Sequence, residues 1–160
     1  MGWNVSMSVI KHPAPLDLPG HLGLSPELEP RTLSFYEAVS RDYTGHALAQ
    51  TRGLYLVVHQ FWWDFDWSDL TEAELAMSFF LSENRGGANT FTIWEYGERV
   101  RHWEEADPTW TARHPLERGL PYEVHPADYV SDVAARLIGF RVPFQGPDDD
   151  LTWVSYREPR

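Results

Sequence analysis

A nearly continuous apolar run from Leu54 to Trp63 is the feature that most restricts the fold of this chain. Strands with one exposed face alternate apolar and polar residues, whereas strands buried on both faces are apolar throughout. The run therefore predicts a central strand of a sheet that is covered on both faces. Residues 53 to 67 as one strand would span about 50 Å at ~3.3 Å per residue, which is too long for one small domain. We therefore expect a bend or bulge near Asp64.

The residues that end this run combine aromatic rings with carboxylates. Residues 61 to 67 read Phe-Trp-Trp-Asp-Phe-Asp-Trp, and no Lys or Arg occurs from residue 53 to residue 84. Strand alternation places the four odd-numbered aromatic residues on one face, and Trp62, Asp64 and Asp66 on the other. Because large aromatic side chains dominate both cores and binding hot spots, this segment is either a core strand leaving the sheet or a patch that binds a partner. The acidic residues of the stretch are Asp64, Asp66, Asp69, Glu72, Glu74 and Glu83.

The charge balance restricts the class of partner. The chain has 160 residues, no Cys and a formal net charge of −11. Its length predicts a single domain over residues 1–160, and the lack of Cys excludes disulfides and thiolate metal sites. Phosphate binding needs a positive surface, so free nucleic acid and anionic membranes are poor partners, whereas a basic protein or a cationic ligand fits better. An acidic surface also serves solubility alone.

Targeting signals are weak in this sequence. No apolar run approaches the ~20 residues of a membrane span, and the amino terminus lacks a basic region followed by an apolar core. We therefore expect a cytoplasmic protein. Residues 1–6 match the short myristoylation pattern, but they also begin the alternation of a strand, and we favour the strand.

A capping signal predicts a helix after the acidic stretch. Thr71 and Glu74 have the spacing of a capping box, and Leu70 and Leu75 are placed for a hydrophobic staple. The predicted helix runs to about residue 84, where two glycines follow.

The remaining patterns complete the predicted fold. From residue 53 the order is strand, helix, hairpin, helix, strand, which is the βαββαβ order of a ferredoxin-like domain. A strand and a helix precede it. We therefore predict an α+β fold, with a mostly antiparallel sheet and helices on one face. The other predicted elements are strands at 3–9 and 151–156, helices at 33–43 and 126–137, the latter ending at Gly139, and a hairpin at 91–103.

The hairpin supplies a second candidate surface. A type II′ turn at Gly97-Glu98 would pair Trp94 with Arg101. If Phe91 and Ile93 face the core, one outward face carries an aromatic and basic set that could bind a carboxylate, a phosphate or a protein. The alternative is a cross-strand ladder that only stabilises the hairpin. The set is Trp94, Tyr96, Arg99, Arg101 and Trp103.

Catalytic and metal-binding signatures are weak. His102 and Glu104 share a strand face near Glu95, but two or three ligands without a spacing motif do not define a metal site. His59 fits a core histidine better than a base, and residues 148–150 fit a solvated turn better than a Ca²⁺ loop. No phosphate loop, nucleophile elbow or zinc-protease motif occurs. We assign no catalytic residue and expect no cofactor.

Two functional hypotheses remain. The first is an acidic interaction protein that binds and neutralises a basic protein partner, in the manner of an immunity or antidote protein paired with a toxin. The alternative is an enzyme or binding protein for a small ligand, such as a sugar or metabolite, with a Trp-lined pocket and carboxylates. The residues predicted to contact the partner are Trp62, Asp64, Asp66, Trp67, Asp69, Glu72, Trp94, Tyr96, Arg99, Arg101 and Trp103.

Overall fold

The fold was analysed in a computed structural model of the chain. Antiparallel strands dominate it, and α3 is the only helix of more than four residues in the part that the structure describes. The structure describes residues 4–29, 31–39, 45–51, 53–59, 65–82, 88–142 and 151–157. The strands are β1 (Asn4–Lys11), β2 (Ser25–Pro26), β3 (Thr32–Leu33), β4 (His46–Thr51), β5 (Leu54–His59), β6 (Leu75–Ser82), β7 (Thr90–Glu95), β8 (Glu98–Glu104) and β9 (Trp153–Arg157). The helices are α1 (Leu18–His21), α2 (Phe35–Ala38), the 3-10 helix η1 (Pro115–Glu117) and α3 (Pro126–Ile138).

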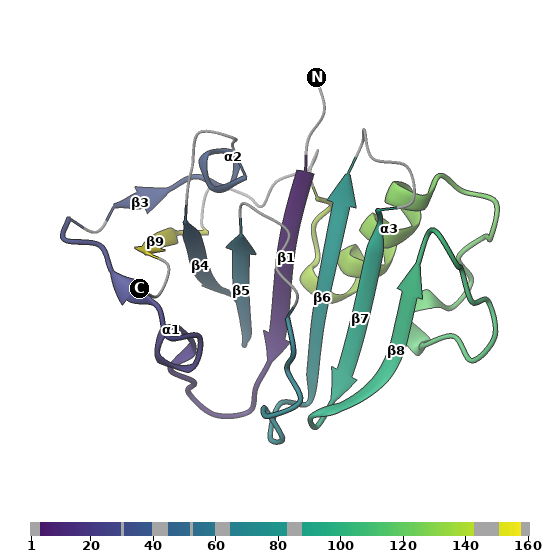
Figure 1. Cartoon of the computed structure of the whole chain (residues 1–160), viewed down its shortest axis with the longest axis horizontal. Helices are drawn as coiled ribbons and strands as arrows, with labels where there is room; N and C mark the ends of the chain where they lie inside the picture. Colours follow the sequence, from purple (N-terminus) through teal and green to yellow (C-terminus); the bar gives the residue numbers. More distant parts are fainter. Residues whose placement is uncertain are drawn as a thin grey trace.

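Within these segments, nine strands form one sheet in the order β2-β9-β4-β5-β1-β6-β7-β8, and β3 also pairs with β9 (Figure 1). Every neighbouring pair is antiparallel. β1 lies at the centre, where Met7 is opposite Val58 of β5 and opposite Phe79 of β6. The two hairpin-connected halves of the sheet are therefore held together by the first strand of the chain.

Both faces of the sheet are apolar and covered. α3 lies behind β6, β7 and β8 in Figure 1 and packs on β6. The core on that face includes Met77, Phe91 and Trp103, all buried. The opposite face buries Val57 and Trp94 beneath two segments with little regular structure, which contain residues 16–24 and 65–73. β1 is therefore buried on both sides, with Val5, Met7 and Val9 toward one face and Ser6 and Ser8 toward the other.

α3 follows the sequence signals for a helix. Pro126 occupies its first turn, and the ring of His125 accepts a hydrogen bond from the Ala127 N–H at 3.3 Å. Gly139 ends the helix in the left-handed conformation with φ 83°, which glycine adopts without strain. The helix predicted from Pro126 to its stop at Gly139 is confirmed.

The predicted ferredoxin-like α+β fold is wrong. The segment expected to be a helix from Thr71 to about residue 84 contains β6, which pairs with both β1 and β7. Met77 and Leu81, which a helix would have placed away from its apolar face, are fully buried. Burial on both faces and hydrogen bonding to two neighbours outweigh the local capping signal. The capping box of Thr71 and Glu74 is replaced by turn hydrogen bonds, including Ala73 N–H to Leu70 C=O at 3.1 Å.

Other predicted elements also differ from the structure in their bounds. In the predicted helix at 33–43, the described residues form only α2 and part of β3. The central strand predicted from Leu54 is β5, and the bend expected near Asp64 lies outside the described residues. The hairpin turn is at Tyr96-Gly97, one residue earlier than predicted, so Trp94 is opposite Arg99. A register shift between Ile93 and Trp94 then places Ile93 opposite Arg101.

None of the helices in these segments has the length and apolar character needed to cross a bilayer.

The two capping signals give a matched test of the fold. Ser34 caps α2, since its hydroxyl accepts from the Glu37 N–H at 3.2 Å and the Glu37 carboxylate accepts from the Ser34 N–H at 2.6 Å. Ser34→Ala should lower the free energy of unfolding by about 0.5–2 kcal/mol, the usual cost of a lost cap. Thr71→Ala should change it by less than ~0.5 kcal/mol, because no cap is lost. Urea denaturation midpoints of both variants check this. A larger loss for Thr71→Ala than for Ser34→Ala would contradict the fold.

Candidate functional site

The structure divides the predicted partner-binding residues between the surface and the core. Trp62 and Asp64 lie outside the described residues. The exposed ones are Asp66, Asp69, Glu72, Tyr96 and Arg99, and the buried ones are Trp67, Trp94, Arg101 and Trp103. The outward face expected for the hairpin is therefore not formed. Trp94 packs in the core of one sheet face, and Trp103 packs in the core of the other.

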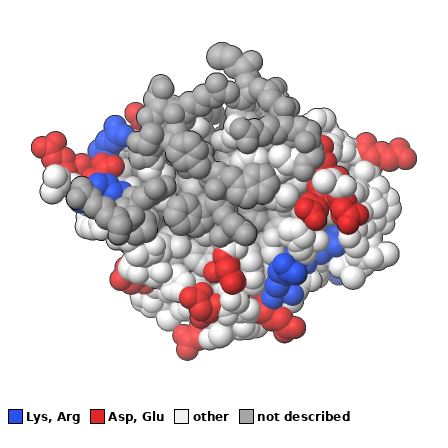
Figure 2. Space-filling view, in the orientation of Figure 1, with Lys and Arg blue, Asp and Glu red and all other residues white. Residues whose placement is uncertain are grey.

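The exposed acidic residues gather at one end of the sheet, where the segment before β6 meets the β7–β8 turn. The Tyr96 N–H donates to the Ala73 carbonyl at 2.9 Å. A Cβ added to Gly97 would lie 2.5 Å from the Ser68 carbonyl oxygen, so the two backbones are in close contact. Figure 2 shows carboxylates at this edge of the molecule, with basic side chains beside them. We call this surface the acidic end, and it consists of Asp66, Asp69, Glu72, Glu74, Tyr96 and Glu98.

Basic side chains contact only some of the carboxylates of the acidic end. Lys11 Nζ lies 3.1 Å from Glu74 Oε1, and His21 Nε2 lies 3.3 Å from Asp69 Oδ1. Glu72 and Glu98 form no ion pair with any residue in the described ranges. Exposed ion pairs of this kind contribute little to stability, about 0–1 kcal/mol each. The surface therefore remains negative and open to a cationic partner.

Tyr96 projects from the middle of the acidic end. Its side chain is 63% exposed, and its backbone has φ 51°. A two-residue hairpin turn with positive φ at both positions favours Asn followed by Gly, since a bulky residue is strained there. Here Tyr takes the place of Asn before Gly97. The result is an aromatic side chain exposed on a turn whose backbone is fixed by Ala73.

Trp67 lies beneath the acidic end rather than on it. It is 1% exposed, and its indole N–H donates to Ser78 Oγ at 2.9 Å, with Ser8 Oγ at 3.3 Å. Its ring stacks on Phe65 at 5.1 Å with an interplanar angle of 7°. Trp67 therefore cannot be a contact residue for a partner. It holds the acidic segment against the sheet.

A cavity of about 510 Å³ adjoins the acidic end, and we call it the Trp94 cavity. It brings together three predicted site residues, Asp66, Trp94 and Arg99. The Asp66 carboxylate accepts a hydrogen bond from the Ser68 N–H at 2.9 Å, and this bond lowers the pKa of Asp66. An acid catalyst would need a raised pKa, so the cavity suits binding better than proton donation by Asp66. Its lining is Phe65, Asp66, Ser68, Thr92, Trp94, Arg99 and His102.

His102 in this cavity does not complete a catalytic relay. Its Nδ1 lies 2.8 Å from Thr92 Oγ1, the residue opposite it on β7. Its Nε2 is 3.9 Å from Glu104 Oε1, beyond hydrogen-bond distance. His102 and Thr92 therefore form a cross-strand hydrogen bond. Among the residues that the structure places, no group of three or more His, Asp or Glu side chains is arranged to hold a metal ion.

His59 is buried in the sheet, as its sequence position indicated. It is 2% exposed and meets His46 edge to face, with ring centroids 4.4 Å apart. Burial lowers the pKa of His59 well below 6.5, and the neighbouring His46 lowers it further. The imidazole is therefore neutral at physiological pH.

A buried ion pair attaches the long 105–125 segment to the sheet. Arg101 Nε and Nη2 donate to the two carboxylate oxygens of Glu117, each at 2.9 Å. The Tyr129 hydroxyl of α3 donates to the same carboxylate at 2.6 Å. Arg101 also donates to the Thr109 carbonyl at 2.6 Å. One carboxylate thus joins β8, η1 and α3.

The protonation of this network follows from its hydrogen bonds. Burial alone would raise the pKa of Glu117, but hydrogen bonds from Arg101, Tyr129 and the His114 backbone hold it below its ordinary value. Burial and the bond to Glu117 raise the pKa of Tyr129 to about 12. Glu117 is therefore ionised and Tyr129 is neutral over the physiological range. The network has a structural role.

Sequence reasoning missed this network. We placed Arg101 on an exposed face and assigned no role to Glu117. The available signal was alternation, because Arg101 and Trp103 are two apart on β8 and must share a face. A buried Trp103 therefore implies a buried Arg101, and a buried arginine requires a carboxylate partner.

No protein family, curated protein or solved structure that was compared with this chain matches it.

The Glu117 network gives a stability prediction. Glu117→Gln should cost about 3–5 kcal/mol, because it leaves the Arg101 charge buried and unpaired. In the unaltered protein the contribution of Glu117 is present above the unfolded pKa of about 4.5 and is lost as the pH falls through the lower folded value. The variant should therefore lose less stability than the parent between neutral and acidic pH. Chemical denaturation at several pH values measures both effects. Arg101→Met combined with Glu117→Leu is the matched control and should cost less than Glu117→Gln alone.

Proposed function

We propose that the protein binds a basic protein partner through the acidic end and blocks it, as an immunity or antidote protein blocks a toxin. The observation that carries this proposal is Tyr96, exposed on a clamped turn among exposed carboxylates. Tyrosine is enriched at binding hot spots because it offers a large contact area and a hydroxyl. Carboxylates around such a residue complement a cationic surface.

The two parts of the acidic end would have different roles. The rim residues Glu72 and Glu98 are exposed and have no ion pair with a described residue, so they would attract a basic partner over several ångströms. Rim charges act mainly on the association rate and its salt dependence. Tyr96 would bury its ring in the complex and slow dissociation. The net charge of −11 adds to the attraction.

Rigidity supports this assignment. The hydrogen bond from Tyr96 N–H to Ala73 and the contact of Gly97 with Ser68 fix the turn in the unbound protein. A partner that binds a fixed turn loses less conformational entropy than one that must order a loop. The strain at Tyr96 also favours function, because strained backbone residues cluster at functional sites.

The edge of the sheet is a less suitable binding surface. β8 is the outermost strand on its side of the sheet described here. It carries Glu98, Arg99 and Glu104, and its pairing with β7 is irregular next to Ile93. Charges and bulges are devices that prevent edge strands from pairing with another chain. Recognition by strand addition is therefore disfavoured at this edge.

A second candidate function is the binding of a small ligand in the Trp94 cavity. Its volume of about 510 Å³ falls in the range of ligand pockets, and it combines the Trp94 ring with Arg99 and Asp66. This corresponds to the alternative hypothesis from the sequence, in which the protein binds a small ligand. It lacks a carboxylate with a raised pKa, so it has no support as an acid catalyst.

Tyr96→Asn tests the principal proposal, because it separates binding from folding. Asn suits positive φ before Gly, so the free energy of unfolding should stay the same or rise. Loss of a hot-spot ring should speed dissociation of the complex by about 10- to 30-fold. The partner is first captured from the native host at moderate salt, and rates are then measured by surface plasmon resonance. Recovery of no basic protein, or a Tyr96→Asn protein that binds like its parent, would contradict the proposal.

Charge reversal provides the companion measurement. Glu72→Lys combined with Glu98→Lys should slow association and flatten its salt dependence, with a smaller effect on dissociation. Glu29→Lys combined with Glu123→Lys, two exposed reversals outside the acidic end, is the matched control. Equal slowing by the control would show that only net charge matters.

A further inference from the structure

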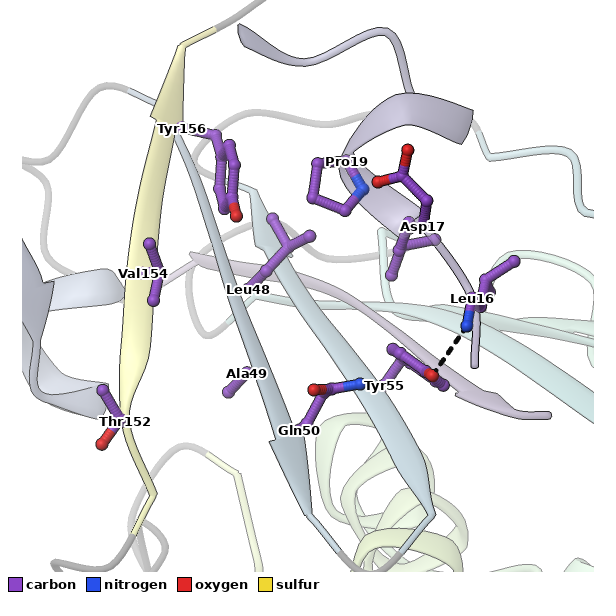
Figure 3. A pocket seen from close by; sticks show the side chains of 11 residues that line it. Leu16, Asp17, Pro19, Leu48, Ala49, Gln50, Tyr55, Thr152, Val154 and Tyr156 are labelled. Atoms are coloured by element: carbon purple, nitrogen blue, oxygen red, sulfur yellow. Dashed lines mark hydrogen bonds between the residues drawn. The ribbon is translucent and has the colours of Figure 1, made fainter. Parts of the chain in front are cut away.

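A second cavity lies on the other half of the same sheet face, and we call it the Tyr156 cavity. Its volume is about 410 Å³, and it lies between α1 and the strands β4, β5 and β9 (Figure 3). It shares no lining residue with the acidic end or the Trp94 cavity. The lining residues are Leu16, Asp17, Leu18, Pro19, Leu48, Ala49, Gln50, Tyr55, Thr152, Val154 and Tyr156.

Part of the cavity lining is apolar. Leu48 and Val154 come from adjacent strands, and Tyr156 faces Pro19 across the opening (Figure 3). Leu48 is 8% exposed and belongs to the core of this face. A slot between an aromatic ring and a proline fits a flat apolar group, which would bury its surface on both sides.

The polar groups of the cavity are held in fixed orientations. Asp17 Oδ1 accepts from the Gly20 N–H at 3.1 Å and so caps α1. The Tyr55 hydroxyl accepts from the Leu16 N–H at 2.9 Å, as drawn in Figure 3. That hydroxyl keeps its own hydrogen for donation, and the carboxylate keeps lone pairs for a ligand donor. Fixed groups of this kind orient a ligand at little entropic cost.

The charge of the cavity selects the ligand class. Asp17 is its only charged lining residue in the part of the chain described. A carboxylate disfavours an anionic ligand and favours a donor or a cation, to which it can form a charge-assisted hydrogen bond. The volume lies within the range of small-molecule sites, roughly 300–1,000 Å³.

We propose that the Tyr156 cavity binds a small amine with a flat apolar body. The apolar body occupies the slot between Tyr156 and Pro19, and the ammonium group reaches the Asp17 carboxylate. The Tyr55 hydroxyl borders the same space. The site shares no lining residue with the acidic end.

Calorimetric titration of three probes with one ring system tests this proposal. Tryptamine carries the cation, tryptophol is neutral and indole-3-acetate is an anion. Tryptamine should bind about tenfold more tightly than tryptophol, the difference expected for a charge-assisted hydrogen bond, and indole-3-acetate should bind most weakly. Amide chemical shifts should locate tryptamine at residues 16–19, 48–50 and 154–156. The proposal fails if tryptamine does not bind at millimolar concentration, or if the shifts lie elsewhere.

Asp17→Asn removes the charge and keeps the cap, because Asn caps a helix as well as Asp. It should reduce tryptamine affinity about tenfold, to the level of tryptophol, and leave tryptophol affinity unchanged. Asp107→Asn, an exposed change outside the cavity, is the matched control. Equal tryptamine affinity for the parent and Asp17→Asn would overturn the role of the carboxylate.

Discussion

The burial of Trp67 determines how the second face of the sheet is covered. α3 covers the first face, but the second face, also apolar, is covered by two segments with little regular structure of their own. Such segments hold their place only through side-chain contacts. Trp67 supplies the strongest of these, since it is nearly fully buried and its indole N–H reaches the hydroxyl groups of Ser8 and Ser78 on adjacent strands. His21 stacks on the Trp67 ring at 6.0 Å and joins the two covering segments.

The packing of these two segments on the sheet produces both the acidic end and the Tyr156 cavity. Because Trp67 and Leu70 point into the sheet, the acidic residues between and after them point to solvent and form the acidic end. The other covering segment places α1 over β4 and β9, where its small size leaves the Tyr156 cavity. The Arg101–Glu117 pair has the corresponding role on the first face, where it attaches the long segment before α3. The chain thus uses side-chain anchors where it lacks long helices.

Local signals predicted the elements whose structure is locally determined. The strand at β1, the helix α3 with its stop at Gly139, and the strand at β9 follow from alternation, periodicity and breakers. β6 could not be predicted in this way, because a central strand buried on both faces has no period of its own and Thr71 with Glu74 imitated a helix start. The carboxylates Asp66, Asp69 and Glu72 were predictable as a surface, since carboxylates are rarely buried unpaired. The burial of Arg101 and Trp103 was not predictable, because a register shift between Ile93 and Trp94 places these two residues opposite Ile93 and Phe91 instead of on the face of Trp94.

Native-state hydrogen exchange of a Trp67→Ala protein tests the central role of this residue most directly. Removing a buried Trp should lower global stability by about 3–5 kcal/mol. If Trp67 pins the second face, amides at 16–24 and 65–73 should lose more protection than those of α3, and they should do so together, because His21 links them through the Trp67 ring. Uniform loss across the molecule, or unchanged protection at 16–24, would contradict the account.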